Sequence, residues 1–304
     1  GDANETYTEK TYTYTYTFSQ KFTLTKNVKL TVPASKSVVA MKSLEIEAEE
    51  FVNNGKNAAR IMCEKSSEYA VTGDGTGTIT ITPNYVGRET VLTLKLTIKL
   101  AFGDGGVGQT QTVEYPITVL PAVEITPNYP NPSGKQTLDR EYIKKDETFT
   151  NILAFFNDTA TYAEKDSSRL QLKSITGKGE DGKYTYGTTP QKWSSTTNKP
   201  TITITECRNV KFTINGETYG AGATITDFSN ETIKFSRDAG ERSIITFMVT
   251  YKGVSAFYTV EVLDEVYIVD TNYQTNNIDS GDFPSPSTES ETTSIPVTYE
   301  ILYV

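Results

Sequence analysis

Residues 81–99 read ITPNYVGRETVLTLKLTIK, and residues 235–252 read FSRDAGERSIITFMVTYK. In each stretch a glycine, Gly87 or Gly240, precedes an Arg/Glu pair, a hydroxyl residue and a long run of alternating residues. Apolar side chains that recur at every second position predict a β-strand with one buried face. The chain therefore repeats a supersecondary unit, and this repeat decides the predicted fold.

The correspondence between the two halves extends beyond these strands. Each half turns and ends on a further strand, TVEYPITVL at 112–120 and FYTVEVL at 257–263. The residues that follow also match, AVEITPNY at 122–129 and EVYIVDTNY at 265–273. Two strands joined by a turn predict a hairpin at the end of each unit, which places boundaries near Pro121 and Leu263.

The rest of the chain also favours strands. Alternation runs through even positions from 12 to 32, and it recurs at 44–48, 79–81 and 92–102. Helix is expected only around Asn151 to Phe156. Strands with one face buried and one face wet explain this pattern, so the fold class is all-β.

The hairpin ends at 81–119 and 235–263, with a proline-bearing junction between the units, resemble bacterial cell-surface proteins that carry tandem immunoglobulin-like domains. Among these proteins, the chain is similar to the surface lipoproteins of gut anaerobes. Such domains serve as spacers, adhesin modules or glycan-binding modules, so the resemblance implies no catalytic residues. It also implies an exported protein at the cell surface or outside the cell, lipid-anchored through a residue missing from this chain.

We predict two tandem immunoglobulin-like β-sandwich domains, 1–121 and 122–263, the second with a long loop at 176–200. Residues 264–304 contribute C-terminal strands. Two strands cannot enclose a core of their own. These strands therefore either pack on the second domain or begin a third unit.

Composition excludes several classes of function. The net charge of −9 argues against nucleic acid, whose phosphates require clustered Lys and Arg. No run of 18 apolar residues exists, so no membrane-spanning segment is expected. Histidine, the commonest general base and metal ligand, is absent from the chain. Cys63 and Cys207 are expected to be separate buried thiols, with a disulfide across the domain boundary as the alternative. We predict no enzyme and no cofactor.

Two acidic motifs are candidates for a catalytic or a metal site. Glu45, Glu47 and Glu49 alternate with apolar residues, which predicts a solvated strand face and not a pair of catalytic carboxylates. Residues 138–141, Leu-Asp-Arg-Glu, match a short motif of calcium-binding cadherin repeats, but the partner Asp/Asn-rich linker motif is missing. We therefore predict no metal site.

Trp193 is the sole tryptophan, and it lies in the 176–200 loop with Tyr184 and Tyr186. Aromatic faces beside polar groups can hold a sugar ring, although a tryptophan more often caps a core. The segment 11–18 offers an edge strand that pairs either within its own sheet or with another subunit.

The predicted function is a non-catalytic cell-surface module for adhesion or for spacing and presenting other domains. The alternative is a surface glycan-binding protein, and a further alternative is a pilus-type structural subunit. The expected partner is a surface polysaccharide or a protein, and the chain is expected to be a monomer.

Overall fold

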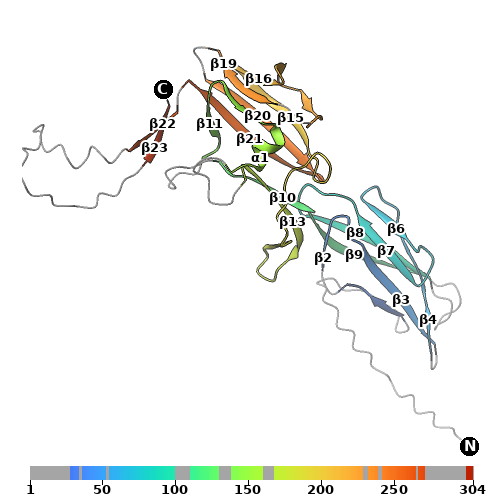
Figure 1. Ribbon diagram of the computed structural model, residues 1–304. Helices are drawn as coiled ribbons and strands as arrows, with labels where there is room; N and C mark the ends of the chain where they lie inside the picture. Colours follow the sequence, from blue (N-terminus) through green and yellow to red (C-terminus); the bar gives the residue numbers. More distant parts are fainter. Residues whose placement is uncertain are drawn as a thin grey trace, which may run out of the picture. The chain divides into compact units, whose positions relative to one another are not determined.

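The structure of the protein, a computed structural model, consists almost entirely of β-strands in the part that it describes (Figure 1). The chain divides into two compact units, Gly1–Asn84 with Glu89–Leu120 and Tyr85–Arg88 with Pro121–Val304. Among the described residues, no helix has the length and apolar character needed to cross a membrane. The structure describes residues 28–33, 36–52, 55–99, 110–129, 138–159, 168–228, 232–238, 242–264, 266–270 and 299–303.

The first unit is a sandwich of two sheets. The first sheet holds, in spatial order, β1 (Val28–Thr31), β3 (Leu44–Val52), β7 (Thr78–Pro83) and β6 (Tyr69–Thr72), with β4 (Gly55–Ala58) paired to β3. The second holds β2 (Ser37–Val39), β9 (Thr110–Leu120), β8 (Thr90–Lys99) and β5 (Arg60–Cys63). β1 pairs antiparallel with β3, whereas β2 pairs parallel with β9. The N-terminal segment thus contributes an edge strand to each sheet, β1 to the first and β2 to the second. This strand order is immunoglobulin-like, as predicted.

The core of the first unit follows from the alternation in β8 and β9. These strands pair along their whole length, from Thr90 opposite Val119 to Lys99 opposite Thr110, which confirms the predicted terminal hairpin. Their inward side chains are buried: Leu92, Leu94, Leu96, Ile98, Val113, Tyr115, Ile117 and Val119. Each such aliphatic side chain stabilises the fold by roughly 1.5–3 kcal/mol when it leaves water.

The outer edge of β9 carries a proline. The amide of Thr118 donates to the carbonyl of Lys36 on that side, so the even-numbered amides of β9 point to this edge. Pro116 falls in the same phase and has no N–H to donate. A proline at such a position hinders the addition of another strand.

The acidic strand β3 differs in part from the expectation. Glu45 and Glu47 are exposed, as the alternation predicted. Glu49 is only 8% exposed, so the predicted solvated position is wrong for this residue. Lys29 of β1 stands opposite Glu49 on one side and Ala58 of β4 on the other. Flanking strands alone do not account for this burial, because Glu47 also lies between two strands and is exposed.

The second unit has the same plan with an insertion. Its larger sheet holds β11 (Glu141–Lys144), β21 (Val254–Leu263), β20 (Ser243–Tyr251), β15 (Thr201–Arg208) and β18 (Thr224–Ile225). The sheet packed against it holds β12 (Glu147–Phe149), β19 (Ile233–Arg237), β16 (Val210–Ile214) and β17 (Glu217–Tyr219). β11 runs parallel to β21, as β2 does to β9. Between β12 and β15 the chain inserts α1 (Ile152–Asn157), β13 (Leu170–Lys178) and β14 (Tyr184–Tyr186), and β13 also pairs with β10 (Val123–Pro127).

The short helix α1 confirms the one helical expectation. Asn151 caps it, since its side-chain oxygen accepts from the amide of Ala154 at 2.7 Å. Phe155 and Phe156 are fully buried in a core of aromatic rings. The ring centroids of neighbouring pairs in this core lie 4.8 to 6.3 Å apart, within the range of favourable aromatic contacts.

The C-terminal strands β22 (Val266–Asp270) and β23 (Tyr299–Tyr303) pair antiparallel with each other. They form a sheet of two strands. Residues 12–27 of the early alternating segment, and the segment 11–18, lie outside the described residues, whereas β1 forms part of the remainder.

Buried tyrosines predict a loss of stability at alkaline pH. Burial raises the pKa of Tyr115 to about 12, from 10 in the unfolded chain. A group whose pKa is raised on folding stabilises the fold while it is protonated in both states, and this stability is lost as pH rises. We expect the urea midpoint of the first unit to stay level up to about pH 10 and to fall above it. The fall should be smaller in Tyr115→Phe. Equal midpoints at about pH 8 and pH 11.5 would contradict the prediction.

Candidate functional site

The outward side chains of β21, β20, β15 and β18 form one face of the larger sheet in the second unit. Each strand alternates, so the residues between them enter the core. We call this surface the threonine face. It consists of Thr201, Thr203, Thr224, Thr246, Met248, Thr250, Ser255, Phe257 and Thr259.

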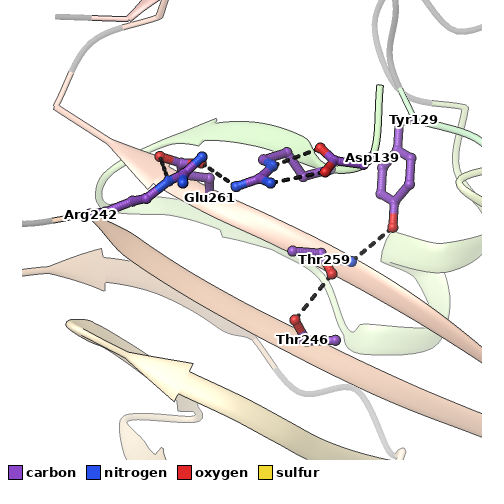
Figure 2. Close-up of polar contacts among 7 residues, drawn as sticks. Tyr129, Asp139, Arg242, Thr246, Thr259 and Glu261 are labelled. Carbon is purple, nitrogen blue, oxygen red and sulfur yellow. Dashed lines mark hydrogen bonds and ion pairs between the residues drawn. The ribbon is translucent and has the colours of Figure 1, made fainter. Parts of the chain in front are cut away.

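Two pairs of hydroxyl groups cross the β20–β21 ribbon on this face. The side-chain oxygens of Thr250 and Ser255 lie 2.7 Å apart. Those of Thr246 and Thr259 lie 3.1 Å apart. A dashed line marks this contact in Figure 2. These contacts orient the hydroxyls and leave their remaining hydrogen-bonding capacity available, because each hydroxyl has one donor and two acceptor sites.

An apolar pair lies between the two hydroxyl pairs. Phe257 stands directly opposite Met248, one step along the face from each hydroxyl pair. The Phe257 side chain is 52% exposed, although its neighbours along the strand are buried. The row continues across the sheet to Thr203 and Thr224, whose hydroxyl oxygens are 3.4 Å apart. An exposed aromatic residue thus sits among uncharged hydroxyls.

Phe257 was not among the predicted site residues, although the sequence contained a signal for it. In β21 the buried phase runs through Ala256, Tyr258, Val260 and Val262. Phe257 is the aromatic residue in the opposite phase. An aromatic residue out of phase with the core points to the surface, so the alternation alone could have identified it.

One end of the face carries a compact group of charges around Glu261 (Figure 2). Arg140 donates to this carboxylate at 2.9 Å, and Arg242 donates to both of its oxygens at 3.0 and 3.2 Å. Asp139 accepts two hydrogen bonds from Arg140, which lower the pKa of its carboxyl. Two carboxylates and two guanidinium groups leave this end with no net charge.

Tyr129 lies at the edge of β21, beside the face. The amide of Thr259 donates to the hydroxyl oxygen of Tyr129 at 3.0 Å (Figure 2). The ring of Tyr129 also packs on Tyr258, with centroids 4.8 Å apart. The contact gives a partner to a backbone donor next to the short strand β11.

A buried ion pair lies under the face. Arg169 donates through Nε to both oxygens of Glu141, at 3.1 and 2.9 Å, and through a terminal nitrogen to the carbonyl of Phe155. The hydroxyl of Tyr258 donates to Glu141 at 2.6 Å. Burial and the neighbouring carboxylate raise the pKa of Tyr258 well above its usual value. This network joins the insertion to β11 and β21.

The same contacts account for the Leu-Asp-Arg-Glu motif. The carboxylate of Asp139 is bound by Arg140, and that of Glu141 by Arg169 and Tyr258. Calcium requires several oxygen ligands that are free to turn to the ion. Among the described residues, no group of three or more acidic or cysteine side chains has the arrangement of a metal site.

Trp193 lies in the core of the second unit, with 3% of its surface exposed. Its indole N–H donates to the carbonyl of Leu170 at 2.8 Å. Asn157 makes two hydrogen bonds to its backbone, at 2.8 and 2.9 Å. Its ring meets that of Tyr251 edge-on. The indole therefore has no open face for a sugar in this structure.

The other two predicted ligand-binding residues lie together on β14. Tyr186 is 37% exposed and Tyr184 is half-buried. The hydroxyl of Tyr186 donates to the carboxylate of Glu124, which raises the pKa of the tyrosine to about 12. Lys173 lies 5.1 Å from the centre of the same ring. Ligand binding by Tyr184 and Tyr186 stays a prediction.

Comparisons with known proteins give structural likeness without a family. No family model and no curated protein matches the chain. The C-terminal domain of the Streptococcus agalactiae AgI/II polypeptide BspA aligns at 8% identity over 77% of this chain and 99% of that chain, with a TM-score of 0.27. Titin domains z1z2 in complex with telethonin align at 13% identity over 80% and 98%, with a TM-score of 0.23. A protein of unknown function from Porphyromonas gingivalis W83 aligns at 6% identity over 78% of this chain and 99% of that chain, with a TM-score of 0.21. At such TM-scores the fold assignment rests on this chain's own strand order.

The buried ion pair gives a stability prediction. Arg169→Met leaves the Glu141 carboxylate buried without its cation, which should lower the free energy of unfolding by about 3–5 kcal/mol. Lys95→Met removes a cation from the exposed pair with Glu64 and should cost less than about 1 kcal/mol. Urea unfolding of both variants measures the difference. Equal losses of unfolding free energy in the two variants would contradict a larger contribution from the buried pair.

The position of Trp193 gives a spectroscopic prediction. Because the sole indole is buried, its emission should lie toward the blue and resist quenching by acrylamide. Soluble polysaccharides should leave the spectrum unchanged, since no ligand reaches the ring. An emission shift on addition of a polysaccharide would instead place Trp193 at a binding site.

Proposed function

We propose that this chain is a non-catalytic module of an exported, cell-surface protein, and that the threonine face of its second unit makes adhesive contacts. The observation that carries the proposal is Phe257, which is 52% exposed on β21, between two hydroxyl pairs and opposite Met248, on a face of four paired strands. A large apolar side chain held on a rigid sheet offers area that a partner can remove from water. Scattered exposed residues are common, but this one lies in an ordered row of hydroxyls.

The charged groups near the face support binding over catalysis. Asp139 and Glu261 are bound to guanidinium groups, so neither is available as a general acid or base. The chain has no histidine to take either role. The lipid anchor and the division into domains 1–121, 122–263 and 264–304 belong to the same proposal.

The alternatives differ in what they require of the molecule. A spacer needs only stable sandwiches and no contact through Phe257. A pilus-type subunit needs an open strand edge, and Pro116 disfavours the outer edge of β9 for that purpose. Glycan capture through Tyr184 and Tyr186 uses a different surface, on β14.

A bead assay tests the adhesive role. Microspheres coated with the full chain should bind to at least one surface among cultured epithelial cells, Gram-negative bacteria and yeast. Phe257→Ala should reduce this binding about tenfold, because it removes the central apolar contact. Val91→Ala, at a 63% exposed position of the first unit, is the matched control and should bind like the original chain.

Thermal melting of both variants checks that the substitutions leave the fold intact. Equal binding by Phe257→Ala and the original chain would contradict adhesion through this face and favour the spacer.

A further inference from the structure

The threonine face combines two kinds of surface within one row. Phe257 and Met248 supply apolar area, and Thr203 and Thr224 extend the row with hydroxyls. Strands lie about 4.8 Å apart, so this row spans about 14 Å across the four strands. That length exceeds a single sugar ring and suits an extended chain laid across the strands.

The charges on and around the face select for an uncharged ligand. None of the nine side chains of the threonine face is ionisable, and the charged neighbours on the same side of β15, Glu206 opposite Thr246 and Arg208 opposite Ile244, carry one charge of each sign. At its end, the carboxylates of Asp139 and Glu261 are matched by the guanidinium groups of Arg140 and Arg242. An anionic polymer finds no net positive charge there, and a cationic one finds no net negative charge.

The distribution of apolar area separates a carbohydrate from a protein partner. The centre of a protein interface is typically a packed apolar patch with several aromatic or arginine anchors. Here the exposed apolar area is limited to Phe257 and Met248, and hydroxyl pairs lie on both sides of it. A pyranose ring has the complementary surface, with C–H groups on its face and hydroxyls at its edge.

We infer that the threonine face binds a neutral polysaccharide, an inference that rests on the proposed adhesive function. One sugar ring stacks on Phe257, and its hydroxyls exchange hydrogen bonds with Thr246, Thr250 and Ser255. Hydroxyls serve this purpose because each can donate to one sugar oxygen and accept from another. The next rings along the chain reach Thr203.

Affinity electrophoresis of the full chain provides the test. Gels contain dextran, laminarin, yeast mannan or xyloglucan as neutral probes, and dextran sulfate as the charged counterpart of dextran. At least one neutral polysaccharide should retard the chain. Phe257→Ala should weaken this binding about tenfold or more, while Phe257→Trp, which keeps an aromatic ring, should preserve it.

Two further variants separate stacking from a general effect on the surface. Thr203→Val keeps the shape of the side chain and removes its hydroxyl, so it should weaken retardation by the same polysaccharide. Val91→Ala should migrate like the original chain. Thermal melting of Phe257→Ala and Thr203→Val should match that of the original chain, because both positions face outward.

The inference is overturned if no neutral probe retards the chain, if Phe257→Ala is retarded like the original, or if dextran sulfate retards it more than dextran. The bead assay then distinguishes the two levels of the proposal. Bead binding that still depends on Phe257 would leave the adhesive function standing with a different partner. Bead binding that does not depend on Phe257 would contradict both the adhesive role of this face and its binding of a polysaccharide.

Discussion

The register between β20 and β21 determines both the core and the surface of the second unit. The two strands pair from Ser243 opposite Val262 to Tyr251 opposite Val254. Lys252 and Gly253 connect them with φ angles of 49° and 79°, the geometry of the tight turns that match the twist of a hairpin. A slip of one residue would move every side chain to the other face of the sheet. The same pairing therefore buries Tyr258 and exposes its neighbour Phe257.

Alternation made much of this fold predictable, because a strand in a sandwich must bury every second side chain. The hairpin of β8 and β9, the strand β3 and the helix at Asn151 followed from local sequence. The sequence favoured a buried Trp193, but not its partners Asn157 and Leu170, which lie 36 and 23 positions away. The prediction for Glu49 was wrong because alternation places a side chain on one face of a strand and does not say how much of that face is covered.

The insertion between β12 and β15 contributes a buried ion pair that local sequence does not reveal. Arg169 lies in this insertion, and its charge is buried against Glu141 of β11, 28 positions earlier. Removal of either partner leaves an uncompensated charge, so the pair favours one placement of the insertion over others. No spacing rule connects the two residues. The sequence predicted binding residues in the aromatic-rich segment 176–200, whereas the exposed aromatic residue of the candidate site, Phe257, lies on β21.

A binding surface made of paired strands differs from one made of loops. Its side chains are already ordered by the sheet beneath them, so little conformational entropy is lost when a partner docks. Yet an uncharged face gains nothing from long-range attraction, and one exposed aromatic residue supplies limited apolar area. Such a face binds weakly through a single copy. Adhesion by it depends on many copies acting on a repetitive partner, where each contact raises the effective concentration of the next. A polysaccharide presents repeating units of this kind, and a dense array on a cell surface would supply the copies.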